Sequence, residues 1–119
     1  MTRSLILAII ILLTSGFIAC DNPAKDFNRH PASIHYSKHA RCRMECRHID
    51  EAEVREIVDK GEINFGKSDL QMDACHKRYA LEGTSDDDQK LRIIVAECSD
   101  VLTVITVIDL GRDWPCVCE

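Results

Sequence analysis

The sequence predicts an α+β domain in which two N-terminal helices pack on a small, mainly antiparallel sheet of three to four strands. Three observations lead to this prediction. Two segments, 38–47 and 51–60, carry apolar residues at helical spacing. Strand-like runs follow them between residues 62 and 110. At 119 residues, the chain has room for one such domain.

Residues 1–19 have the layout of a secretory signal peptide. Arg3 precedes an apolar run, Leu5–Leu13, that is too short to span a bilayer, and small residues follow. The stretch GFIAC resembles a bacterial lipobox, with Phe17 in place of the usual leucine. This resemblance implies that Cys20 becomes the first mature residue and carries the lipid that anchors the protein. The alternative is that the run forms an anchoring or a buried helix.

Composition and location limit the partners. Residues 20–32 are polar and contain two prolines, so we expect a lipid anchor and tether before a domain at 33–119. Without residues 1–19 the chain has 14 basic and 20 acidic side chains, a net charge of −6, which argues against nucleic acid as a partner. We expect a protein of the bacterial cell envelope that faces the periplasm or the exterior. Its expected partners are the membrane, through the lipid, and a protein of the envelope.

The first helix is expected over residues 38–47. Ser37 is placed to cap its N-terminus, and Ala40 and Met44 lie one turn apart on an apolar stripe.

The second helix has more local signals. Asp50 and Glu53 are spaced as a capping box, and Ile49 and Val54 as a hydrophobic staple. Gly61 is expected to end the helix in the C′ position.

The strands are expected at 62–65, 75–83, 90–98 and 101–110, with a tight turn at Ser99-Asp100. A six-residue hairpin loop would pair Gly83 with Lys90, and that register places Cys75 opposite Cys98. We therefore predict a Cys75–Cys98 disulfide, because cysteines outside the cytoplasm pair by default.

Four cysteines remain, in two matched pairs. Cys42 and Cys46 lie on one side of the first helix, and Cys116 and Cys118 lie on one face of an extended tail. We predict that two disulfides join the helix to the tail, and the spacing leaves open which cysteine pairs with which. The alternative is a four-thiolate site for zinc or copper made by the same residues. We otherwise expect no cofactor.

The segments YSKHARCRMECRHIDEAEVREIVDKGEI, RYALEG, LRIIVAE and TVITVIDL, in this order, resemble the bacterial family catalogued as domain of unknown function 4258. The resemblance covers about Tyr36 to Leu110. It implies a fold related to the RelE and BrnT toxins, some of which are ribonucleases. The residues that it singles out as catalytic candidates are His39, Arg43, Arg47, Tyr79 and Arg92. His48 stands where a glycine with positive φ is common in the family.

Three functions are compatible with these patterns. The first is a non-catalytic binding or structural module, stabilised by disulfides and anchored to the membrane. The second is a cysteine-based zinc or copper protein. The third is a metal-independent ribonuclease, in which a histidine takes the 2′-hydroxyl proton and arginines hold the phosphate. The extracytoplasmic location and the negative charge favour the first over the third.

Overall fold

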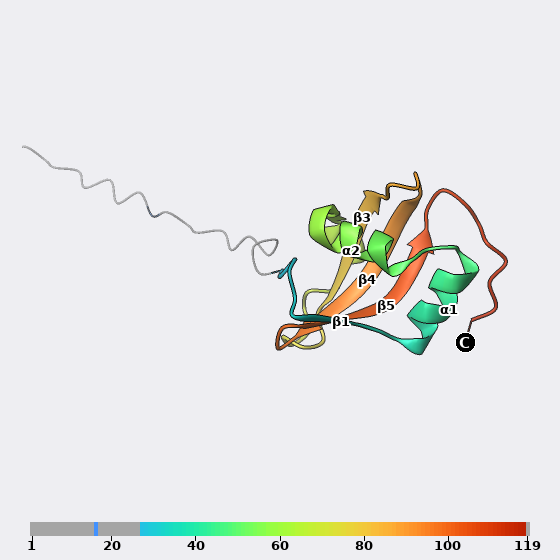
Figure 1. Ribbon diagram of the computed structural model, residues 1–119. Coiled ribbons are helices and arrows are strands. Elements are labelled where there is room, and N and C mark those ends of the chain that lie inside the picture. Colours follow the sequence, from blue (N-terminus) through green and yellow to red (C-terminus); the bar gives the residue numbers. More distant parts are fainter. Residues whose placement is uncertain (1–15, 17–26, 119) are drawn as a thin grey trace, which may run out of the picture.

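A five-stranded mixed sheet of strand order β1-β5-β4-β3-β2 forms the centre of the computed structural model, and both helices lie on one face of it (Figure 1). The structure describes Gly16 and residues 27–118. The expected signal peptide, apart from Gly16, and Cys20 lie outside the described residues. Among the helices that are described, none has the length and apolar character needed to cross a membrane.

The α+β class is confirmed, but the strand count and the order of elements differ from the prediction. The first element is a strand, β1 (Ser33–Tyr36), which pairs in parallel with the last strand, β5 (Val101–Asp109). Ile34 and Tyr36 face the core, as strand alternation requires. Four residues are too few for a clear alternating pattern, and the pairing partner is distant in the sequence.

Both helices form where the local signals predict them. The first, α1 (Lys38–Cys46), begins at Ser37, whose hydroxyl oxygen accepts a hydrogen bond from the Ala40 amide. The second, α2 (Glu51–Lys60), has the predicted Asp50–Glu53 capping box. Between them the chain reverses at His48, whose φ of 55° confirms the positive-φ position expected there.

The remaining strands form an antiparallel meander. A short β2 (Glu62–Ile63) and a 3₁₀ turn (Phe65–Lys67) lead through an irregular segment to β3 (Arg78–Thr84). The chain continues into β4 (Lys90–Cys98) and then β5. The tight turn at Ser99-Asp100 is confirmed, and both of its residues have positive φ.

The predicted hairpin register was wrong by one residue, yet the predicted disulfide is present. Gly83 pairs with Leu91 rather than Lys90, because the loop at 85–89 is closed by a hydrogen bond from the Ser85 amide to the Gln89 carbonyl. Cys75 precedes β3 in a turn, so the strand register does not govern its position. Its Cα lies 4.6 Å from that of Cys98, and the two sulfurs are bonded.

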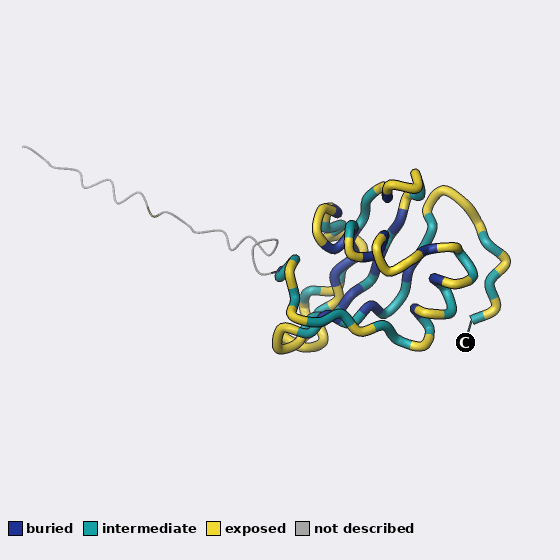
Figure 2. The backbone as a smooth tube through the Cα atoms, in the orientation of Figure 1, coloured by how far each residue is buried: buried dark blue, intermediate teal, exposed yellow. Residues whose placement is uncertain are grey.

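The core lies between the sheet and the helices (Figure 2). Leu81, Ile93 and Val107 are paired across β3, β4 and β5, and all three are fully buried. A register shift at Ile94/Val95 lets both Val104 and Val107 face the helices. Neither α1 nor α2 lies on the opposite face of the sheet (Figure 1).

Part of the segment expected as a tether packs on the domain. Phe27 is buried, with its ring 4.8 Å from that of Tyr79. Arg29 donates to the carbonyl oxygens of Val58 and Gly61 at the C-terminus of α2. The packed structure therefore extends to residue 27, beyond the expected boundary at Ser33.

Gly61 ends α2 as expected, but not through a left-handed conformation, because its φ is −64°. A glycine is needed here for close packing. A Cβ at this position would lie 2.5 Å from the Ile57 carbonyl oxygen and 3.1 Å from that of Glu82.

We predict that Gly61→Ala lowers the free energy of unfolding by about 1–3 kcal/mol, because the added methyl group forces α2 away from β3. Chemical denaturation measures the change. The matched control is Gly66→Ala, whose Cβ would meet nothing closer than 3.4 Å and which should be near neutral. Equal losses in the two variants would contradict this interpretation.

Candidate functional site

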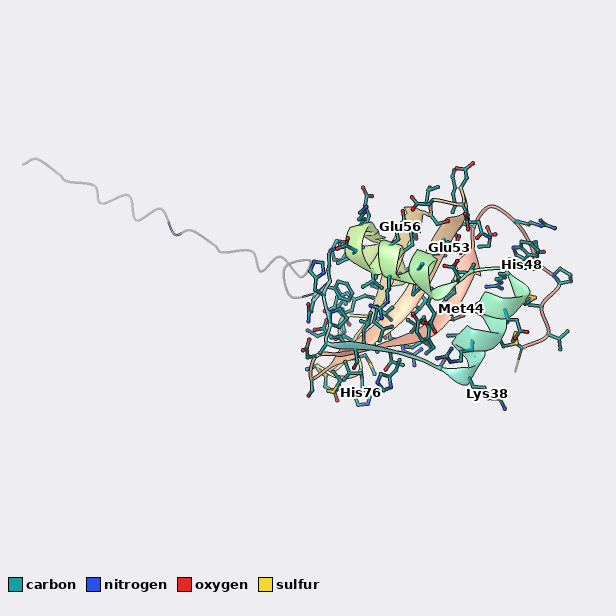
Figure 3. All side chains as sticks on the ribbon, viewed as in Figure 1. Lys38, Met44, His48, Glu53, Glu56 and His76 are labelled. Atoms are coloured by element: carbon teal, nitrogen blue, oxygen red, sulfur yellow. A yellow bond between two sulfur atoms is a disulfide. The ribbon has the colours of Figure 1, made fainter. Side chains whose placement is uncertain are left out.

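Three of the candidate residues lie on one stripe of α1. His39, Arg43 and Arg47 are spaced four apart, so their side chains share one side of the helix. We call these three residues the arginine stripe. It lies between the buried pair Ala40 and Met44 and the side that carries the cysteines. Figure 3 labels Met44 on the core side of α1 and Lys38 at its exposed start.

Both ends of the stripe contact β5 beyond the point where β1 stops pairing. His39 Nε2 lies 3.2 Å from the Thr106 hydroxyl oxygen, and Arg47 donates to the Val107 carbonyl oxygen. The register of β1 on β5 ends at Val104, so α1 replaces β1 along this edge. The stripe is therefore held in the seam between the helix and the edge of the sheet.

The two arginines are crowded and half-buried. Burial lowers the pKa of Arg47, and the neighbouring charge of Arg43 lowers it further, against the opposing effect of Asp109 and Asp113. Asp109 already accepts hydrogen bonds from Trp114 Nε1 and from the Gly111 and Arg112 amides. Burial would raise the pKa of Asp109, but these bonds hold it below its usual value.

Arg43 is the least satisfied of these groups. Its Nε is fully buried, and among residues 27–118 the guanidinium makes no hydrogen bond and no ion pair. A half-buried charge with an unpaired N–H is costly, because the hydration that it loses is not replaced.

The C-terminal tail lies on the other side of α1, as Figure 1 shows in red. Two disulfides hold it there, Cys46–Cys116 and Cys42–Cys118, with Cα separations of 5.8 Å in both. The predicted joining of helix and tail is confirmed, and the open pairing is settled. The tail runs antiparallel to α1, so the earlier tail cysteine meets the later helix cysteine.

Trp114 fills the turn that leads into the tail. Its indole N–H donates to Asp109, its ring centroid lies 5.0 Å from that of His48, and Arg112 stacks on it at 3.8 Å. No residue of the tail is part of a strand in the described chain. The two disulfides and the contacts of Trp114 are therefore the main attachments of the tail.

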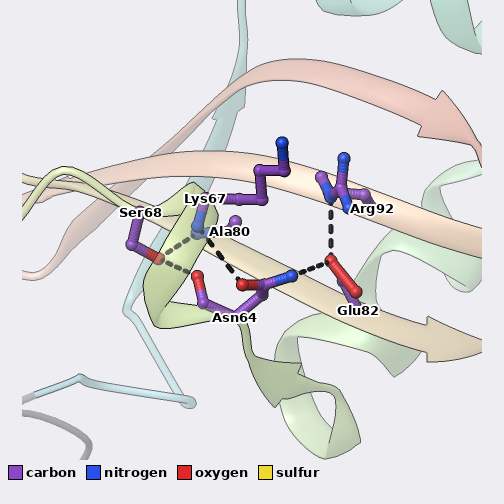
Figure 4. A network of polar contacts seen from close by, with 6 residues as sticks. All are labelled: Asn64, Lys67, Ser68, Ala80, Glu82 and Arg92. Carbon is purple, nitrogen blue, oxygen red and sulfur yellow. Dashed lines mark hydrogen bonds and ion pairs between the residues drawn. The ribbon is translucent and has the colours of Figure 1, made fainter.

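The other two candidates are elsewhere. Tyr79 faces the core between the sheet and the helices, against Phe27. Arg92 lies on the face of the sheet opposite α1 and α2, where its Nε donates to Glu82 at 2.8 Å (Figure 4). Asn64 donates to the same carboxylate oxygen at 2.9 Å. The structure therefore brings His39, Arg43 and Arg47 together and separates Tyr79 and Arg92 from them.

A cluster of three carboxylates was not anticipated as a site. Ligand atoms of Asp50, Glu53 and Asp87 lie within 4.8 Å of one another, beside a cavity of about 580 Å³ along α2. Hard divalent cations favour such oxygen ligands. Burial raises the pKa of Glu53, whose oxygens already accept from the Asp50 amide and the Ser85 hydroxyl. The capping box and the acidic run at 86–88 were the available sequence signals.

The comparisons give one family match. The family model described as a domain of unknown function, DUF4258, matches residues 36–109, which confirms the resemblance found in the sequence. No curated protein and no solved structure matches the chain. The relationship to the RelE and BrnT fold therefore stays a prediction.

We predict that removing one of the two tail disulfides costs less than half of the stability that removing both costs. While one bridge is present, the other closes only a short ring, so Cys46→Ser with Cys116→Ser should cost about 2–3 kcal/mol. Removing both bridges also opens the loop of about 70 residues, which adds about 4 kcal/mol. The total of about 7 kcal/mol is close to the whole stability of a domain of this size. Denaturant unfolding of the two variants tests this.

A near-neutral single-bridge variant would contradict the role of the tail in stability. Alkylation of the native protein without reductant gives a second readout, because none of the six cysteines of the described domain should react. Labelling of Cys42, Cys46, Cys116 and Cys118 only after a chelator is added would instead favour the zinc or copper alternative.

The Glu82–Arg92 pair predicts a pH dependence. Hydrogen bonds from Arg92 and then Asn64 lower the pKa of Glu82, so its contribution is present above the unfolded value of about 4.3 and is lost as the pH falls through the folded pKa. Glu82→Gln should therefore lower the free energy of unfolding by about 1 kcal/mol at pH 7 and by less at pH 3. Glu62→Gln, at the exposed partner position on β2, is the control. A pH-independent difference would refute the ionic role.

Proposed function

The chain belongs to the DUF4258 family, and we propose that it is a non-catalytic binding module of the bacterial cell envelope. In this proposal Cys20 carries a lipid anchor, the three disulfides hold the domain in shape, and α1 with the attached tail is the binding surface. We call this surface, formed by the exposed residues of α1 and of 111–118, the stapled face.

The observation that carries the proposal is the dispersal of the catalytic candidates. His39 contacts Thr106, Tyr79 is in the core, and Arg92 is paired with Glu82 on the far face of the sheet. A general base and a phosphate-binding cation must meet around one reacting group. The five candidates do not surround one common point among the described residues. What the structure does provide is a helix, α1, that two disulfides hold in place.

The stapled face is rigid for a physical reason. A nine-residue helix is marginal in isolation, and two bridges to the tail fix both its position and its rotation. Preorganised surfaces bind with a smaller loss of conformational entropy. The face presents Arg41 and Glu45 from α1, and Val117 of the tail is 93% exposed.

The disulfides support the proposed location. All six cysteines of the described domain are paired, and such bridges persist in an oxidising, extracytoplasmic environment. An exported chain with a lipobox-like GFIAC stretch is a candidate for lipidation at Cys20. The anchor would retain the domain at a membrane and bring the stapled face to an envelope protein.

One observation favours the ribonuclease as a second candidate. His39 and Arg43 share a helix side with Arg47, and together they hold the types of group that metal-independent RNA cleavage uses. This arrangement lacks a second acid–base group of suitable chemistry on the stripe.

We predict that the oxidised protein, purified from its own membrane fraction, leaves single-stranded RNA intact over hours at a large excess of enzyme. His39→Ala and Arg43→Ala, each checked for an unchanged fold by circular dichroism, serve as matched variants. Cleavage by the wild type that both variants lose would overturn the binding proposal in favour of the ribonuclease. The intact mass of the same preparation tests the anchor, because it should correspond to a chain that starts at a lipid-modified Cys20.

A further inference from the structure

We infer that the arginine stripe binds an oxyanion, with Arg43 as its central ligand. The ligand class is a carboxylate or a phosphate-type group, either free or carried by a partner. This inference deepens the proposed binding role of α1 and rests on it. It assigns to Arg43 and Arg47 a recognition role, and to His39 the role of a positioning residue.

The first argument is that Arg43 differs from the other arginines of the described chain. Arg29, Arg41, Arg47, Arg92 and Arg112 each have a partner: a carbonyl oxygen, a carboxylate or an aromatic ring. The two others without a partner, at positions 55 and 78, are exposed and are hydrated by solvent. Arg43 is half-buried with its Nε shielded from solvent, and it has no acceptor in the described residues.

The second argument is the crowding of like charges. Arg43 and Arg47 are close enough for one to lower the pKa of the other, although no carboxylate forms an ion pair with either in the described chain. Asp109 and Asp113 are the acids whose charges act on Arg47. The oxygens of Asp109 are already occupied by Trp114, the 111–112 amides and Gln89. An anion between two guanidinium groups would turn this repulsion into a shared attraction.

The third argument is that Arg47 and the helix that carries Arg43 are both held in place. Arg47 is tied to the Val107 carbonyl through one nitrogen, which leaves its other N–H groups available. His39 is tied to Thr106 at the far end of the stripe. On the other side of α1 the tail is bonded at Cys42 and Cys46, one turn apart, and these bridges keep α1 from rotating. Guanidinium groups bind oxyanions through their forked N–H groups, and a lysine does not reproduce that geometry.

The test is a titration of the full oxidised protein, labelled with ¹⁵N, and followed through the arginine Nε–H signals. The probes are inorganic phosphate, sulfate and acetate, each compared with sodium chloride at equal ionic strength. We expect a saturable shift of the Arg43 and Arg47 signals, and the Arg47 signal reports binding in variants of Arg43. A preference for phosphate and sulfate points to a tetrahedral oxyanion, and a preference for acetate points to a carboxylate.

The variants separate recognition from general electrostatics. Arg43→Gln should weaken binding of the preferred anion about tenfold or more, which corresponds to the loss of a charge-assisted hydrogen bond. Arg43→Lys keeps the charge, and its affinity for the anion should lie between those of the wild type and of the Gln variant. The matched control is Arg55→Gln, an exposed arginine of α2 outside the stapled face, and it should leave binding unchanged.

Three outcomes would overturn the inference: a shift that rises without saturation, a shift that chloride reproduces, or binding that survives in Arg43→Gln. Each is independent of the RNA measurement. If the anion titration fails and no RNA is cleaved, the oxyanion inference is rejected and the proposed binding role of α1 stands. Cleavage of RNA that depends on His39 removes the proposed function, whatever the anion titration gives.

Discussion

The attachment of the tail to α1 is the constraint on which the geometry of the candidate site depends. α1 has only two buried apolar side chains, Ala40 and Met44, and a helix this short gains little from its own hydrogen bonds. β1 leaves the edge of β5 uncovered after Val104, and α1 occupies that place through polar contacts. The bridges at Cys42 and Cys46 supply the stability that a wider apolar stripe would otherwise give. The arginine stripe is positioned as a consequence of this arrangement.

The sequence predicted features set by neighbouring residues better than features set by distant ones. The Ser37 cap, the Asp50–Glu53 box and the turn at Ser99-Asp100 depend on a few adjacent groups, and all three are present. β1 was missed because its partner is β5, at the other end of the domain. The hairpin register was wrong because hydrogen bonds within the 85–89 loop, rather than loop length alone, decide which residues pair.

For the site, spacing along α1 was enough to group His39, Arg43 and Arg47, because helical periodicity is regular. It was also enough to join the tail cysteines to the helix, although their pairing depends on chain direction. The face of the sheet on which Arg92 lies could be known only from the alternation of buried residues along β4. Leu91 and Ile93 face the core, so the residue between them faces the other side of the sheet. The lack of a partner for Arg43 depends on packing around it and has no signal in the sequence.

The pairing of the first strand with the last has a consequence for how the protein reaches its oxidised state. A chain that enters an oxidising compartment N-terminus first presents Cys42 and Cys46 well before Cys116 and Cys118, and the parallel partner of β1 arrives late. Among the six cysteines of the described domain, only Cys75 and Cys98, 23 residues apart, can meet their native partner before the 111–118 segment emerges. The two helix thiols must wait for Cys116 and Cys118, which follow them by 70 and 76 residues, and until then they are open to exchange with other thiols. Oxidation of this domain is therefore coupled to the emergence of the 111–118 segment.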